Sequence, residues 1–170
     1  MKWSLRVLIL LALIFVGFGP GYASGQFFFQ DQETMLVGKA APDFKLKMLS
    51  GKESSLTGFR NGQNTIVFFW ATWCPHCREQ LAQLTKEKEA IERKGIKIAL
   101  VDLAEEVPQV RAYVEKYKVD SDVFLDQDGK VSEQYSVIGV PTFFFVNKEG
   151  VIKSVEHALP ENYEILFSPN

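Results

Sequence analysis

A continuous apolar run at residues 65–70 (TIVFFW) stands just before the only two cysteines of the chain. Its β-branched and aromatic side chains do not alternate with polar ones, and the run is too short for a helix. It therefore predicts a strand buried on both faces. The residues that follow have helical spacing, with four apolar side chains on one face: Cys77, Leu81, Leu84 and Ile91. The sequence thus predicts a strand that leads directly into a helix at the cysteines.

Later segments extend this unit to an α/β fold. Apolar runs at 96–101 and 142–146 predict two more buried strands, and Pro108 begins a second helix between them. Strand–helix–strand connections of this length give parallel strands with helices on the faces. Residues 151–155 predict an antiparallel return of the last strand. We expect a mixed β-sheet flanked by helices on both faces, with a central insert and an N-terminal hairpin that turns at 49–52.

Shorter segments and the composition complete a single-domain prediction. The glycine-rich stretch at 58–63 predicts a loop, and short elements are expected at 123–125, 131–135 and 161–167. The chain has 170 residues, of which 46% are hydrophobic, enough for one core. Its formal net charge is -2 without clustered Lys and Arg, so we expect no nucleic-acid partner.

The beginning of the chain has the features of an export signal. Lys2 and Arg6 precede an apolar stretch at 7–18, and small residues around Ala23 suit cleavage by a signal peptidase. No charge appears between Arg6 and Asp31, so an uncleaved membrane anchor is the alternative. Both alternatives place the domain outside the cytoplasm, in a periplasmic or equivalent compartment. The predicted segments are a signal peptide or anchor over 1–23, a linker over 24–34 and a folded domain over 35–170.

The spacing of the cysteines argues against a structural disulfide. Cys74 and Cys77 enclose only two residues, and so small a ring stabilises a fold little. At a helix start, unpaired backbone N–H groups and the helix dipole favour a thiolate over a thiol. Pro75 would take the first helical position, where its missing N–H costs nothing. An exposed Cys74 as nucleophile and a shielded Cys77 as resolving thiol is the arrangement that thiol–disulfide exchange requires.

Other uses of two cysteines are open at this point. A zinc site would need two further ligands, but the chain has no other cysteine and only two histidines, His76 and His157. A peroxidase would need one reactive cysteine and no resolving thiol three residues away. A protein that only binds a partner protein or a copper ion is a third alternative. His76 itself is either an electrostatic influence on Cys74 or a solvated helix residue.

Two motifs together resemble the thioredoxin superfamily. One is WCPHC at 73–77 after an apolar strand, and the other is GVPT at 139–142 before another strand. The insert at 107–125 and the stretch VPTFFFVNKEG make residues 38–155 similar to the TlpA/ResA-like branch of extracytoplasmic thiol–disulfide oxidoreductases. The resemblance implies a protein-disulfide oxidoreductase with a thioredoxin-like fold.

The resemblance also implies roles for individual residues. Cys74 and Cys77 would be the catalytic dithiol. Pro141 would be cis and face the cysteines, and the backbone of Val140 would pair with bound substrate. The residues that would modulate the site are Trp73, Pro75, His76 and Gln80.

The chain departs from the family pattern where a buried carboxylate is expected. Members that act as reductants carry one near the second cysteine, either on the strand before the motif or three residues after that cysteine. Here these positions are Phe68 and Gln80. Glu79 is adjacent to Gln80, but one residue rotates a side chain by about 100° around a helix, so we expect Glu79 to face solvent.

The direction of electron flow follows from two opposing features. The branch usually reduces disulfides outside the cytoplasm, often in cytochrome c maturation, whereas the Cys-Pro-His-Cys motif is shared, by resemblance, with the oxidant DsbA. We expect the reductant role, with a protein-thiol oxidant as the alternative. The resemblance implies cysteine-containing protein substrates and a membrane electron-transfer partner protein. It implies no metal, and no cofactor besides the dithiol.

Overall fold

The computed structural model describes residues 34–168. The signal peptide or anchor predicted over 1–23 and nearly all of the linker predicted over 24–34 lie outside the described residues. Among the helices at 34–168, none is both long enough and apolar enough to cross a membrane.

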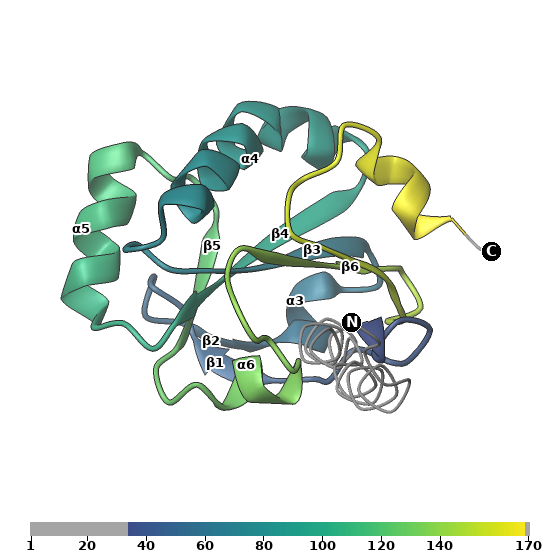
Figure 1. Ribbon diagram of the computed structural model, residues 1–170, viewed down its shortest axis with the longest axis horizontal. Helices are drawn as coiled ribbons and strands as arrows, with labels where there is room; N and C mark the ends of the chain where they lie inside the picture. The colour runs from purple at the N-terminus through teal and green to yellow at the C-terminus, as the bar shows by residue number, and fades with distance from the viewer. Residues whose placement is uncertain (1–33, 169–170) are drawn as a thin grey trace, which may run out of the picture. The chain divides into compact units, whose positions relative to one another are not determined.

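A five-stranded mixed sheet forms the centre of the domain (Figure 1). Its strand order is β5-β4-β3-β6-β7; the first three of these strands are parallel, and β6 and β7 run antiparallel to their neighbours. The predicted crossovers and the C-terminal hairpin are therefore confirmed. The strands are β3 (Asn64–Trp70), β4 (Ile96–Leu103), β5 (Asp122–Asp126), β6 (Thr142–Val146) and β7 (Ile152–Glu156).

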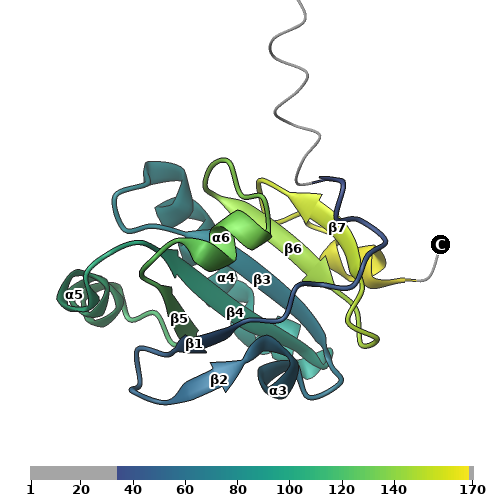
Figure 2. The ribbon, with the colours of Figure 1, turned by 90° about the horizontal axis from the view of Figure 1, so that it is seen from below.

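Helices cover both faces of this sheet, as expected. Figure 2 shows the face opposite α4 (Pro75–Arg93), where short helices and the predicted N-terminal hairpin lie. The elements that pack on one face are α4 (Pro75–Arg93), α5 (Val107–Tyr117) and the 3-10 helix η1 (Tyr163–Phe167). The elements on the other face are β1 (Lys45–Lys47), β2 (Glu53–Ser55), α3 (Leu56–Arg60) and α6 (Lys130–Gln134).

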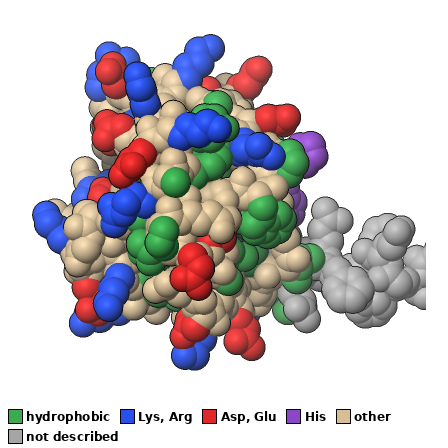
Figure 3. All heavy atoms as spheres, turned by 90° about the vertical axis from the view of Figure 1, so that its left-hand side faces the viewer, with side chains coloured by type: hydrophobic (Ala, Val, Ile, Leu, Met, Phe, Trp, Pro, Cys, Tyr) green, Lys and Arg blue, Asp and Glu red, His purple; other side chains and the backbone are tan. Residues whose placement is uncertain are grey.

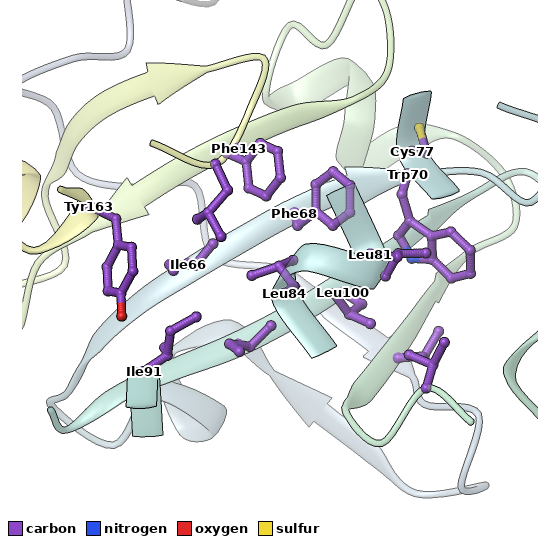
Figure 4. Close-up of a cluster of buried hydrophobic side chains, with 14 of the residues drawn as sticks. Ile66, Phe68, Trp70, Cys77, Leu81, Leu84, Ile91, Leu100, Phe143 and Tyr163 are labelled. Carbon is purple, nitrogen blue, oxygen red and sulfur yellow. The ribbon is translucent and has the colours of Figure 1, made fainter. Parts of the chain in front are cut away.

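Alternate side chains of β3 supply two separate cores, because successive residues of a strand point to opposite faces. Phe68 and Trp70 belong to the cluster under α4, and Val67 and Phe69 belong to the cluster under the hairpin. Phe68 stacks on Phe143 of β6 with a ring-centroid distance of 4.1 Å. Full burial of such a side chain contributes about 1.5–3 kcal/mol. Figure 4 shows the cluster under α4, with Trp70 at one end of it.

The long helix α4 matches the sequence prediction closely. Its buried residues are the four that the helical spacing indicated, Cys77, Leu81, Leu84 and Ile91. The helix ends before Gly95, whose φ of 71° is in the left-handed region that glycine adopts without strain.

The structure corrects two short predictions. The first half of the expected loop over 58–63 belongs instead to α3 (Leu56–Arg60), which is capped by the Ser55 Oγ accepting the Gly58 N–H at 3.0 Å and ends at the left-handed Asn61. A helix of five residues is little more than one turn, so it leaves no periodic pattern in the sequence. The closing helix is a 3-10 helix at Tyr163–Phe167 and is shorter than the predicted 161–167.

Candidate functional site

The two cysteines lie where β3 leads into α4. Cys74 is the N-cap residue of α4, and its Sγ accepts a hydrogen bond from the backbone N–H of Cys77 at 3.2 Å. Pro75 is in the first turn of the helix, where proline loses no hydrogen bond. Both cysteines are free thiols. The predicted helix-start geometry is therefore present, with one backbone N–H already directed at the Cys74 sulfur.

The burial of the two sulfur-bearing residues differs from the prediction at Cys74. Cys77 is 0% exposed, as expected, and lies beside Trp70 at the end of the buried cluster (Figure 4). Cys74 is only 4% exposed, so the prediction of an exposed nucleophile was wrong. The reason is a tertiary contact, because the Cys74 thiol donates a hydrogen bond to the carbonyl oxygen of Val140 at 3.4 Å.

The surroundings of Cys77 keep its thiol protonated. Burial raises the pKa of the Cys77 thiol to about 12, and its hydrogen bond to the Cys74 sulfur acts in the same direction. A hydrogen bond from the Ala71 backbone opposes this shift only in part. Cys77 is therefore a thiol at neutral pH.

The segment before β6 brings the second predicted motif against the first. The peptide bond between Val140 and Pro141 is cis, as the resemblance implied. Trp73 and Ile138 flank this contact in the sequence, and their side chains are 65% and 54% exposed. Figure 3 shows the face of the molecule that carries α5, where Lys and Arg are interspersed with Asp and Glu and hydrophobic side chains lie between them.

His76 faces solvent rather than the sulfurs. Its side chain is 79% exposed, and its Nδ1 lies 3.5 Å from the Oε2 of Glu79. Glu79 is 72% exposed, as predicted from its rotation around the helix. The geometry favours the solvated-residue alternative for His76.

Gln80 makes a contact that the sequence did not indicate. Its Oε1 accepts the backbone N–H of Leu159 at 2.7 Å, and Gln83 of the same helix lies 3.5 Å from the Leu159 carbonyl oxygen. Where the family pattern has a carboxylate, this chain therefore has an amide that holds the segment after β7. In the same segment the His157 Nδ1 lies 3.1 Å from the carbonyl oxygen of Pro141.

Sequence reasoning missed a pair of buried carboxyl groups beside the cysteine loop. Asp102 is 1% exposed at the end of β4, and Glu105 is 7% exposed in the loop that follows. Glu105 accepts the backbone N–H of Thr72 at 2.5 Å and the Thr72 hydroxyl at 2.6 Å. A signal was present, because β3 and β4 were predicted parallel and the carboxyl ends of parallel strands meet at one edge of a sheet.

This fold, with a dithiol at the start of α4 and a cis proline opposite it, is that of a thioredoxin-like protein. The model of the AhpC/TSA family matches residues 37–155, and the chain belongs to this thioredoxin-like family.

Individual relatives place the chain more narrowly. The thiol-disulfide oxidoreductase ResA of Bacillus cereus is 32% identical over 147 residues, which are 86% of this chain and 83% of the relative. The crystal structure of StoA from Bacillus subtilis has 29% identity and a TM-score of 0.62, over 74% of this chain and 94% of that chain. The thioredoxin domain of a Bacteroides vulgatus thiol-disulfide oxidoreductase has 28% identity and a TM-score of 0.69, over 76% and 94%. The prediction of a ResA-like thiol–disulfide oxidoreductase is confirmed.

Proposed function

We propose that Cys74 and Cys77 exchange disulfides with cysteine-containing proteins outside the cytoplasm, and that the chain acts there as a reductant, as in cytochrome c maturation. The observation that carries this proposal is the pair of contacts at the Cys74 sulfur. One is the hydrogen bond from the Cys77 N–H, and the other is the hydrogen bond to the Val140 carbonyl oxygen. The similarity to ResA supports the reductant role.

The reaction begins at Cys74. Its thiolate attacks one sulfur of a substrate disulfide, a mixed disulfide forms, and the other substrate sulfur leaves as a thiolate. Cys77 then loses its proton and attacks the Cys74 sulfur, which closes the Cys74–Cys77 disulfide and releases the second substrate sulfur. Two electrons pass from the dithiol to the substrate, and the two thiol protons balance the two substrate thiolates.

The environment of Cys77 gives the two steps their order. Because its pKa is raised to about 12, Cys77 stays protonated while Cys74 reacts with substrate. The hydrogen bond from the Cys77 N–H stabilises negative charge on the Cys74 sulfur both before the attack and when that sulfur becomes the leaving group of the reverse reaction.

Substrate binding uses the contact that buries Cys74. When Cys74 enters a mixed disulfide it has no proton to donate, so the Val140 carbonyl oxygen becomes free to accept a backbone N–H of the substrate. Trp73 and Ile138 offer exposed apolar surface on the two loops that meet there. This arrangement suits an extended peptide around a substrate cysteine.

Reduction must be renewed after each cycle. Outside the cytoplasm the electrons would come from a membrane electron-transfer partner protein, to which the exported or anchored chain has access. The dithiol is sufficient for the exchange, so the proposal includes no cofactor and no metal.

The redox state of the dithiol in cells tests this proposal. Cells that express the full chain are quenched with acid, free thiols are alkylated with a reagent of added mass, and the chain is resolved by size. A reductant is found mainly as the dithiol, whereas a predominantly oxidised pair would favour the oxidant alternative. A protein that only binds partners or copper would keep that affinity after Cys74→Ser, whereas an exchange enzyme loses turnover.

A further inference from the structure

Asp102 is a buried carboxyl group without a well-formed hydrogen bond. It lies opposite Trp70 in the parallel register of β3 and β4, and its side chain therefore points to the same face as Trp70, toward α4. The residue is 1% exposed, and among the described residues neither carboxyl oxygen has an N–H or O–H donor in hydrogen-bond geometry. An ionised carboxylate in such a place would be costly, because nothing replaces its lost hydration.

Glu105 has the opposite surroundings. Its carboxylate accepts the Thr72 N–H, the Thr72 hydroxyl and the Gln109 side-chain amide. Three donors make it the member of the pair that is suited to carry negative charge. Thr72 belongs to the loop between β3 and Cys74, in which the Cys74 N–H in turn donates to the Ala71 carbonyl oxygen at 3.2 Å.

The two carboxyl groups lie close together. Asp102 is opposite Trp70, and Glu105 is bonded to Thr72, two residues further along the chain. After burial, Glu105 is the largest influence on the pKa of Asp102. Two ionised carboxylates have no donor, so a hydrogen bond between them forms only when one of them is protonated. Since Glu105 already receives three donors and Asp102 receives none, Asp102 is the group on which that proton would reside, with its O–H directed at Glu105.

We propose that Asp102 and Glu105 share one proton and together fix the loop that presents Cys74, so that Asp102 is a positioning residue for disulfide exchange. The consequence for exchange rests on the proposed role of Cys74, but the shared proton does not. Burial, the hydrogen bond with Glu105 and the charges of Glu105 and Asp126 raise the pKa of Asp102 to about 8, against a smaller effect of the Glu105 backbone.

Loss of the shared proton would release the loop. The other charged group near Asp102 is Asp126 of β5, whose carboxylate accepts the N–H groups of Val131 and Ser132 and is fixed there. On the helix side, Cys77 and Tyr113 belong to or pack against the buried cluster that Trp70 joins, and both are neutral at pH 7 because burial raises their pKa values. Within residues 34–168 no Lys or Arg forms an ion pair with these carboxylates. A second charge on Asp102 would therefore repel Glu105 and weaken its hold on Thr72.

Infrared spectroscopy tests the shared proton directly. The C=O stretch of a protonated carboxyl group is followed as a function of pH in the reduced full-length protein. We expect a band that persists at pH 7, titrates near pH 8 and is absent in Asp102→Asn. In Glu105→Gln the midpoint should move to lower pH, because the charge and the hydrogen bond that retain the proton are gone. Glu106→Gln, which removes an exposed neighbouring carboxylate, is the matched control and should leave the band unchanged.

The pH profile of exchange tests the positioning role. The amide introduced by Asp102→Asn cannot ionise and donates an N–H to Glu105 at every pH, so this variant imitates the protonated form. The ratio of kcat/KM of Asp102→Asn to that of the wild type should rise above about pH 8, by up to about tenfold for each pH unit. A constant ratio would show that Asp102 does not position the loop. An unchanged infrared band in Asp102→Asn, or an unmoved midpoint in Glu105→Gln, would overturn the shared proton whether or not the chain turns over.

Discussion

The Cys74 thiol donates a hydrogen bond to the Val140 carbonyl oxygen at 3.4 Å, across 66 positions of the sequence. This contact joins the start of α4 to the loop before β6, and with it the two motifs that identify the site. It also buries a sulfur that must reach a second protein. Exchange therefore begins with the replacement of one intramolecular hydrogen bond by contacts to substrate.

The roles of the two cysteines can be separated by trapping. In Cys77→Ser the resolving thiol is absent, so the mixed disulfide between Cys74 and substrate should accumulate. In Cys74→Ser no such adduct should form, since Cys77 is fully buried and protonated. Non-reducing electrophoresis after alkylation measures both adducts. Equal trapping by the two variants would reverse the assignment.

Trp73 should matter for protein substrates more than for small disulfides. Trp73→Ala removes an exposed aromatic surface next to Cys74, so we expect KM for a protein substrate to rise by about tenfold, equivalent to ~1.4 kcal/mol of binding free energy. Turnover of a small disulfide and the free energy of unfolding should change little. Ile165→Ala, at a similarly exposed residue of η1, is the control and should leave both KM values unaltered.

A carboxylate at position 80 should add a titration to the pH profile. Gln80→Glu keeps an oxygen that can accept the Leu159 N–H, so the fold should be retained. A half-buried carboxyl group one turn after Cys77 gives that thiol a nearby proton acceptor. Steady-state reduction of a protein disulfide between pH 5 and 9 measures the change. Glu79→Gln, on the exposed side of α4, should keep the wild-type profile, and an identical profile in Gln80→Glu would mean that position 80 does not reach Cys77.

The buried Asp102 should make stability depend on pH. Its pKa is about 8 in the folded protein and about 3.9 in an unfolded chain, so between these values only the folded state holds the proton. The free energy of unfolding should therefore fall as pH rises through this window, by up to about 1.4 kcal/mol per pH unit from this residue. Urea unfolding at pH 5 and at pH 8 measures it. Asp102→Asn should lose this slope, and Glu106→Gln should retain it.

His76 should have a small effect on the reduction potential. Its side chain is 79% exposed, so solvent screens any charge that it carries from the sulfurs. We expect His76→Ala to shift the potential by no more than about 20 mV, the scale of one exposed ion pair. A glutathione redox equilibrium measures this shift. A change several times larger would favour the other alternative, in which His76 acts electrostatically on Cys74.

The sequence by itself determined the elements and the reaction class. The apolar run before Cys74, the helical spacing from Cys77 to Ile91 and the motif around Pro141 are local patterns. The physical rules that they follow act over a few residues, on strand alternation, helix capping and turn geometry. These patterns were sufficient to predict the sheet, the helix start at the dithiol and the buried position of Cys77.

Only the tertiary structure decided what surrounds the dithiol. Cys74 is buried by Val140, Gln80 holds Leu159 across 79 positions, and Glu105 holds Thr72 across 33. Each of these contacts joins segments that are far apart in the sequence, so no local pattern of residues indicates it. Each also depends on side chains that meet only after the sheet has formed. The charge state of the site follows from those contacts, because a carboxyl group or a thiol keeps its proton according to the donors and the burial that the fold provides.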